Sequence, residues 1–192
     1  MYKLCKTEQS ARRQRELEQG LLAAMENHYY EEISVSDLCD QLQIPRKSFY
    51  RYFSNKEGAL HALIDHSLLE FESFLPDGYD SGNRSSQMDL ERFFRFWKEK
   101  HLLLDALSRS GISGTLVIRA VDHAMSDVGV PSRFLLQDQQ QTRRYATMFG
   151  VCGLMSLVLN WHAEGFAVPE SEMAAIATEL MTRPLFAQSD TK

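Results

Sequence analysis

The sequence lacks the features that mark secreted proteins. Its three cysteines, Cys5, Cys39 and Cys152, are an odd number and lie far apart, with no C-x-x-C pair. This spacing predicts reduced thiols in a cytoplasmic protein rather than a disulfide framework. The first 20 residues contain no apolar run of the kind found in a secretory signal peptide, so we expect no export.

Patterns typical of enzymes and metal sites are also missing. The chain has no G-x-S-x-G turn, no phosphate-binding loop and no H-E-x-x-H pair. His61 and His66 are five residues apart, which places them on different faces of a helix and argues against a zinc pair. We therefore expect no enzymatic activity, no cofactor and no metal.

One uncharged run, residues 145–163, is long enough to span a bilayer. Polar residues are spread through it (Thr147, Ser156, Asn160 and His162), and no basic cluster or aromatic pair brackets both of its ends. We interpret this run as a buried helix of a protein that does not enter the membrane.

Helical periodicity runs through almost the whole chain, and the β-branched stretch at residues 33–35 is too short for a strand. The pattern predicts an all-α protein of about nine helices. Helices are expected near residues 7–27, 34–42, 45–53, 54–74, 88–111 (one helix or two), 113–128, 134–164 and 169–185, with a linker at 76–86.

The N-terminal third contains start signals for closely spaced helices. Ser34 with Asp37, and Ser54 with Glu57, have the spacing of capping boxes. Pro45 is suited to begin a helix, because the first turn does not need its missing N–H group. Two short helices joined just before Pro45 have the form of a helix-turn-helix, whose second helix enters the major groove of DNA.

Positive charge gathers at this unit although the chain has a net charge of −5. Residues 43–56 carry four cations and no acid, and residues 1–15 carry five cations and one acid. Residues 67–192 carry 12 cations and 16 acids. A basic head on an acidic body predicts binding of double-stranded DNA by one end of the molecule.

The segment ISVSDLCDQLQIPRKSFYRYFSNKEGAL, residues 33–60, resembles the DNA-binding head of the TetR-type bacterial transcriptional regulators. Its most specific part is FYRYFSNKE, residues 49–57. Residues 149–166 are similar to the dimer helix of the same family. The sequence departs from the family pattern at Gln43, where glycine is usual, and at Pro45, where serine or a similar cap is usual.

The resemblance implies a three-helix helix-turn-helix head, residues 1–55, on a helical effector-binding and dimerisation body, residues 56–192. It implies a cytoplasmic homodimer that binds a palindromic operator and acts as a repressor, released by an unknown small apolar or amphipathic effector. Two alternatives stay open. A protein partner could replace the metabolite, or the chain could be a small helical enzyme or carrier with a basic patch.

The resemblance and the side-chain chemistry together suggest which residues touch DNA. Arg46 and Lys47, in the first turn of the recognition helix, are candidates for reading base edges, and Ser48 is short enough to touch a base. Tyr50 and Lys56 match family positions that hold phosphates. The complete set of candidate DNA contacts is Ser34, Ser36, Arg46, Lys47, Ser48, Tyr50, Arg51, Tyr52 and Lys56.

The body has more aromatic surface than a single helix stripe needs, which suggests an apolar pocket between helices with few polar groups. The candidate effector-binding residues are Phe93, Phe96, Trp97, Arg119 and His123.

The uncharged run also predicts a dimer. A helix that is apolar on nearly all sides must be covered on nearly all sides, and the body of one chain can cover only one of them. A second copy would cover the other, with the last helix beside it. The candidate interface residues are Gly150, Val151, Leu154, Val158, Trp161, Ile176 and Leu180.

Overall fold

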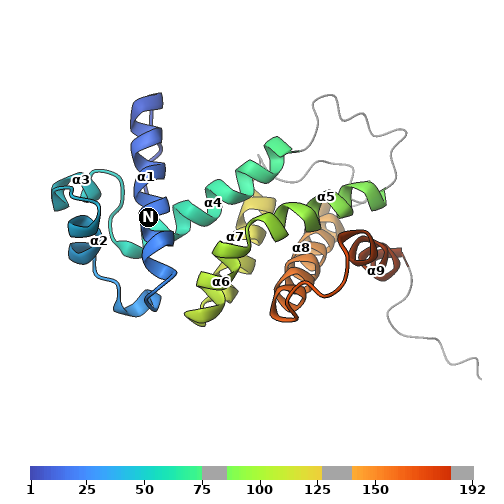
Figure 1. The fold of residues 1–192 in the computed structure, drawn as a ribbon. Helices are drawn as coiled ribbons and strands as arrows, with labels where there is room; N and C mark the ends of the chain where they lie inside the picture. Colours follow the sequence, from blue (N-terminus) through green and yellow to red (C-terminus); the bar gives the residue numbers. More distant parts are fainter. Residues whose placement is uncertain (75–85, 127–139, 183–192) are drawn as a thin grey trace, which may run out of the picture.

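The computed structural model describes residues 1–74, 86–126 and 140–182, and in these residues the chain is all-helical, as predicted (Figure 1). The α-helices are α1 (Glu8–Met25), α2 (Val35–Gln41), α3 (Arg46–Tyr50), α4 (Lys56–Phe74), α5 (Ser86–Glu99), α6 (His101–Arg109), α7 (Ser113–Met125), α8 (Gln140–Ala163) and α9 (Glu170–Thr182), with a short 3-10 helix, η1 (Tyr30–Glu32). Residues 76–85 of the predicted linker lie outside the described residues, as do residues 127–128, 134–139 and 183–185 of three predicted helices.

Local capping explains where the first helices begin. The Thr7 hydroxyl accepts a hydrogen bond from the Ser10 amide at the start of α1. Ser34 and Asp37 form the predicted capping box of α2. The second predicted box is wrong by one residue, because the amide of Gly58 donates to the side chain of Asn55 (2.9 Å) at the start of α4.

The molecule divides into a head, α1–α3, and a body, α5–α9, which α4 connects. In Figure 1, α4 begins beside α1 in the head and runs into the body, where it contacts α5 and α7. The segment 88–111, predicted as one helix or two, is two helices, α5 and α6, which meet at Lys100. A movement of α4 would therefore displace residues in both the head and the body.

The core of the body is aromatic. Phe94 of α5 and Trp161 of α8 are both fully buried, and their rings meet edge to face with centroids 5.6 Å apart. The indole N–H of Trp161 donates to the main-chain oxygen of Val168 (2.8 Å), which fixes the turn between α8 and α9. Against this core, α9 packs chiefly on α5, and α8 packs chiefly on α7.

Helix α8 is covered on one side only. Its stretch Arg144–Ala163 is long and apolar enough to cross a membrane by length and composition, and 22 % of it is buried. The expected burial therefore holds for one face, which includes Met155, Val158 and Trp161. Phe149, on another face, is 70 % exposed.

Candidate nucleic-acid interface

The recognition helix α3 is short and is held to the core by aromatic rings. It spans Arg46–Tyr50, with Pro45 as its N-terminal cap, and so is shorter than the predicted 45–53. Phe49 and Phe53 are 0 % and 1 % exposed, and their ring centroids lie 5.1 Å apart. Because these rings anchor one face of the segment, the opposite face is left for solvent.

The turn between α2 and α3 uses a left-handed residue. Gln43 has φ = 52°, a conformation that glycine adopts most easily. The amide of Gln43 donates to the carbonyl of Asp40 (3.1 Å), and that of Ile44 donates to the carbonyl of Cys39 (2.9 Å). The departure from the family pattern at Gln43 therefore keeps the turn geometry but places a side chain where the family has none.

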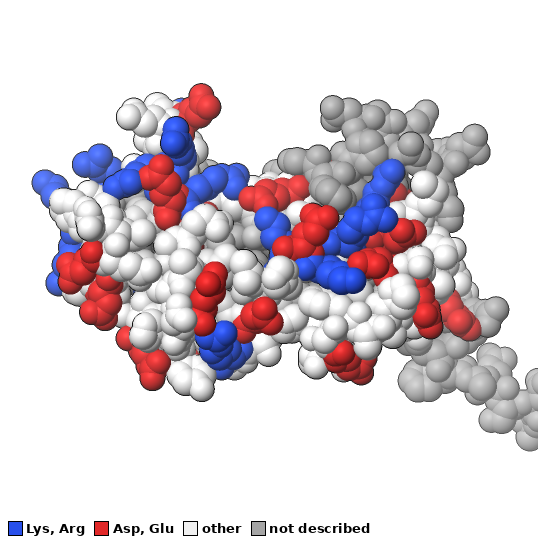
Figure 2. Space-filling view, in the orientation of Figure 1, with Lys and Arg blue, Asp and Glu red and all other residues white. Residues whose placement is uncertain are grey.

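Three cations of the recognition segment face solvent. Arg46, Lys47 and Arg51 are exposed, and none of them forms an ion pair with a carboxylate of the described residues. Figure 2 shows Lys and Arg side chains gathered at the edge of the molecule formed by the head. Unpaired cations on a helix that follows a helix-turn-helix turn are suited to bind phosphates and base edges.

Four other candidate contacts are exposed or half-buried in the head. Tyr50 is 44 % exposed, and Ser48 is half-buried beside it. Ser34 is exposed at the start of α2, but its hydroxyl already donates to the Asp37 carboxylate (2.6 Å). Ser36 is half-buried in the first turn of α2.

Two candidates have other roles in the structure. Tyr52 is only 8 % exposed, so its ring belongs to the core. The Lys56 ammonium donates to the main-chain oxygens of Tyr30, Glu31 (3.3 Å) and Ile33 (2.6 Å), and it lies 4.2 Å from the centre of the Tyr30 ring. These bonds use all three of its N–H donors, and burial lowers the pKa of Lys56. In this structure Lys56 fastens η1 to the start of α4.

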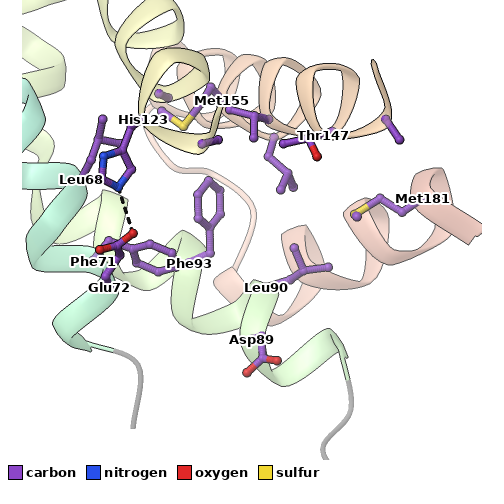
Figure 3. A pocket seen from close by; sticks show the side chains of 16 residues that line it. Leu68, Phe71, Glu72, Asp89, Leu90, Phe93, His123, Thr147, Met155 and Met181 are labelled. Carbon is purple, nitrogen blue, oxygen red and sulfur yellow. Dashed lines mark hydrogen bonds and ion pairs between the residues drawn. The ribbon is translucent and has the colours of Figure 1, made fainter. Parts of the chain in front are cut away.

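A cavity of about 190 Å³ lies in the body between α4, α5, α7, α8 and α9. Its walls are apolar except for Glu72, Asp89, His123 and Thr147. At one side the imidazole of His123 hydrogen-bonds to the Glu72 carboxylate (2.9 Å), as Figure 3 shows. Such a space, apolar with a few polar groups, has the form of a small-molecule site.

Of the five predicted effector residues, Phe93 and His123 line this cavity. Phe96 and Trp97 do not, because both are buried in the aromatic core next to it. Arg119 bonds instead to the Asp65 carboxylate (2.8 Å from Nε). The sequence missed Glu72, because it lies 51 residues from His123 and no local pattern joins them.

Two of the predicted dimer residues, Val158 and Trp161, are wrong, and the others differ in their exposure. Val158 and Trp161 are 0 % and 1 % exposed within the single chain, so they cannot meet a partner. Gly150, Val151 and Leu154 line the cavity, whereas Ile176 and Leu180 are exposed at 38 % and 42 %. The apolar side chains of α8 that do reach solvent are Tyr145, Met148 and Phe149.

Comparisons with known proteins agree with this architecture. Residues 22–63 match the sequence profile of the family described as bacterial regulatory proteins, tetR family. By sequence alone, no curated protein matches the chain.

Several solved structures share the fold at low sequence identity. A tetR-family transcriptional regulator from Streptomyces coelicolor is 15 % identical, with a TM-score of 0.55 over 89 % of this chain and 79 % of that one. The fatty acid degradation regulator FadR from Bacillus halodurans is 13 % identical, with a TM-score of 0.58 over 96 % and 100 %. The TetR family repressor AlkX from Dietzia sp. strain DQ12-45-1b, implicated in biodegradation of n-alkanes, is 16 % identical, with a TM-score of 0.50 over 88 % and 96 %.

The matched residues 22–63 contain the complete helix-turn-helix, including the turn at Gln43 and the three unpaired cations of the recognition segment. The helical body accounts for the remaining length of the shared fold. The chain therefore carries the DNA-binding head of the tetR family of bacterial regulatory proteins, on a helical body whose fold is shared with solved transcriptional regulators.

Proposed function

We propose that this regulator is a homodimeric repressor, which binds a palindromic operator through α3 and leaves it when a small apolar or amphipathic compound fills the body cavity. The observation that carries the DNA-binding part is the set of exposed, unpaired cations Arg46, Lys47 and Arg51. We propose no catalytic role, and the protein would work in the cytoplasm, where its operator is.

The position of each cation suggests its task. Arg46 and Lys47 lie in the first turn of α3, the part of a recognition helix that reaches base edges in the major groove. Arg51 and the exposed ring of Tyr50 lie at its other end, where the DNA backbone passes, with Ser34 and Ser36 at the start of α2. Tyr52 and Lys56, which are engaged inside the head, are the weakest members of the predicted set.

The dimer would form on the uncovered faces of α8 and α9. Tyr145, Met148 and Phe149 of α8 are 62 %, 39 % and 70 % exposed, and α9 exposes Ile176 and Leu180. Two copies of this pair of helices would bury these side chains in a four-helix interface. The same two-fold axis would present two recognition helices to a palindromic site.

The dimer can be tested with two matched variants. Phe149→Glu places a charge in the proposed interface, and Ile118→Glu places one on α7 at a similar exposure of 63 %. Light scattering should give twice the 22.1 kDa chain mass for the wild type and for Ile118→Glu, and the single mass for Phe149→Glu. A monomeric wild type at micromolar concentration would disprove the interface, and recovery of the protein only in the membrane fraction would point to α8 as a membrane helix.

The effector proposal rests on the apolar walls of the cavity. Leu68, Phe71 and Phe93 line the space, with the Glu72–His123 pair offering polar groups at one side (Figure 3). Val151 and Leu154 line it as well. Two regulators of similar fold are named for fatty acid degradation and n-alkane biodegradation, which is in keeping with an apolar ligand.

A melting-temperature screen with 1-decanol and decanoic acid tests the cavity. Ala124→Phe would fill the space from α7 and should abolish any shift, whereas Ala23→Phe, on the exposed face of α1, should not. If wild-type melting responds to neither probe and to no compound of a metabolite library, control by a protein partner becomes the better proposal.

The DNA-binding part is tested by selecting duplexes from a random pool on the wild-type protein. We expect a palindrome whose half-sites are centred about one helical turn or a multiple of it apart. We also expect its affinity to fall steeply with salt concentration. Selection of a non-palindromic site, or of none, would refute the proposed mode of binding.

A further inference from the structure

The first five residues form what we name the N-terminal strap, Met1–Cys5, and it lies along the end of the recognition segment. The amide of Ser54 donates to the carbonyl of Met1 (3.1 Å), and the amide of Lys3 donates to the carbonyl of Tyr52 (3.0 Å). Tyr2 and Phe53 pair in antiparallel fashion between these two bonds. The strap therefore holds the residues that directly follow α3.

The same strap reaches the body through the Tyr2 side chain. The Tyr2 hydroxyl donates to the Asp65 carboxylate of α4 (2.8 Å), and Asp65 also accepts two N–H groups from Arg119 of α7. Asp65 is only 6 % exposed, so it depends on these partners for its solvation. Burial and the bond to Asp65 raise the pKa of Tyr2, which keeps its hydroxyl a neutral donor.

A second group of contacts fixes the strap against α1 and α4. The Tyr2 ring meets the His66 imidazole edge to face, with centroids 5.9 Å apart, and His66 bonds to the buried carboxylate of Glu18 (2.8 Å). The Cys5 thiol donates to the side-chain oxygen of Gln14 (2.8 Å). The strap is thus anchored by side chains at both of its ends.

Gly58 shows that the fold reserves space for the strap. A Cβ at this position would lie 2.5 Å from the main-chain oxygen of Met1, a distance that real Cβ atoms do not tolerate. Glycine inside a helix costs about 1 kcal/mol relative to alanine. The close approach of the strap to the helix explains why glycine occupies this position in the first turn of α4 despite that cost.

The body end of this connection is a wall of the cavity. Arg119 is followed on α7 by Ala120, His123 and Ala124, all of which line the cavity. A shift of α7 would therefore move the Arg119 guanidinium relative to Asp65. Because Tyr2 shares that carboxylate, the shift would reach the strap and the end of the recognition segment.

We propose that the N-terminal strap is a positioning element, in which Tyr2, Asp65 and Arg119 couple the cavity wall on α7 to the orientation of α3. The assignment rests on the proposed function, since it gives the route by which an occupied cavity would disturb DNA binding. It concerns residues that touch neither the DNA nor the ligand.

The amide of Ser54 is a direct reporter of the strap, because its acceptor is Met1. We would measure its hydrogen exchange by NMR in the wild type, Tyr2→Phe, Arg119→Lys and the double variant, without DNA or ligand. Arg119→Lys keeps the charge but loses the two-pronged bond to Asp65. Each single variant should speed the exchange about tenfold, as the loss of one hydrogen bond of ordinary strength implies.

Coupling requires that the double variant exchange no faster than either single one. Arg95→Lys, in an exposed pair with Glu91, is the matched control and should leave Ser54 unchanged. Two results would overturn the proposal. One is an unchanged exchange rate of the Ser54 amide in Arg119→Lys, and the other is a double variant whose rate increase equals the product of the two single increases.

Gly58→Ala tests the strap without touching the polar residues. It should displace Met1 and speed Ser54 exchange, whereas Gly114→Ala, in the first turn of α7 with no atom within 4 Å of the added Cβ, should not. Equal behaviour of the two variants would show that the strap does not need this space, against the proposal.

Binding to the duplex selected on the wild type completes the test. Tyr2→Phe and Gly58→Ala should weaken binding several-fold with an unchanged salt dependence, because no phosphate contact is lost. Unchanged affinity in both would contradict the positioning role. If the wild type selects no duplex, the proposed function fails, while the exchange measurements still decide whether the strap couples α7 to α3.

Discussion

The cations of the recognition segment and those of the body differ in whether they have partners. In the recognition segment, Arg46, Lys47 and Arg51 face solvent without a carboxylate of the described residues beside them. In α5, α6 and α7, each Arg and Lys has a partner, and so does Lys100 between α5 and α6. Arg92 pairs with Asp89, Arg95 with Glu91, Lys98 with Glu170, Lys100 with Glu70, Arg109 with the Glu26 carbonyl and Arg119 with Asp65.

This difference shows why a chain with a net charge of −5 can bind a polyanion. Cations that are paired in place stabilise the fold and attract little from outside, whereas unpaired cations keep their full field for a partner. The two arrangements are visible in Figure 2, where acids and cations interleave over the body and Lys and Arg gather at the edge of the head. Near the recognition segment Lys56 is the exception, because it is used internally. In α1, Arg12 and Arg13 pair with Glu16, and Arg15 pairs with Glu70.

The largest effect should come from breaking a pair in the body. Arg119→Met leaves the Asp65 carboxylate, which is 6 % exposed, with Tyr2 as its one remaining partner among the described residues. The free energy of unfolding should fall by about 3 kcal/mol. Urea denaturation measures it, with Arg95→Met as the control, since that exposed pair should contribute less than about 0.5 kcal/mol. Similar losses in both variants would mean that burial does not separate the two classes of pair.

Lys56→Met tests the exception. If the Lys56 ammonium stabilises the fold through its bonds to the carbonyls of Tyr30 and Ile33, the free energy of unfolding should fall by about 2 kcal/mol in this variant. The sequence predicts a phosphate contact at this position instead. In that case stability would hardly change, and the salt dependence of DNA binding would fall by about one unit. Denaturation and a salt titration on the same variant separate the two roles.

Removing an unpaired cation of the head should do the reverse. Arg46→Ala and Lys47→Ala should change the free energy of unfolding by less than about 0.5 kcal/mol, as is usual for exposed residues. Binding of the selected duplex should weaken by about 1 to 3 kcal/mol, with little change on unrelated DNA. Arg51→Ala should weaken both kinds of DNA alike. A stability loss without a binding loss would show that these cations serve the fold.

How much the sequence could predict depends on how local each feature is. Three features depend only on residues a few positions apart, and the structure contains all of them: the capping box of Ser34 and Asp37, the helix-turn-helix and the basic head. The cap of α4 was misplaced by one residue because Ser54 and Asn55 are both good caps, and only the fold decides between them.

Features that join distant segments could not be predicted. Helix α8 is apolar on nearly all sides, so its sequence has no stripe that indicates which face turns inward. The prediction that Val158 and Trp161 face a partner is wrong for this reason. Tyr2 lies 63 residues from Asp65, and Lys56 lies 23 residues from Ile33. Such contacts follow from tertiary placement, which side-chain spacing does not contain.

The smallest effect concerns the backbone, where head and body again differ. Two turns of the body place glycine in the left-handed region, Gly111 (φ 67°) and Gly165 (φ 68°), whereas the head places Gln43 there (φ 52°). A side chain in this region costs about 1 kcal/mol, and the greater freedom of glycine in the unfolded chain offsets part of the gain on replacing it. Gln43→Gly should therefore raise the free energy of unfolding by less than about 1 kcal/mol. Gln19→Gly, at an exposed position in the middle of α1, is the control and should lower it by up to about 1 kcal/mol, because glycine disfavours a helix interior. Urea denaturation of both variants gives the comparison, and a loss of stability in Gln43→Gly would mean that the Gln43 side chain supports the turn. Binding of the selected duplex should be unchanged, since the turn keeps its two hydrogen bonds to Asp40 and Cys39 whichever residue occupies the position.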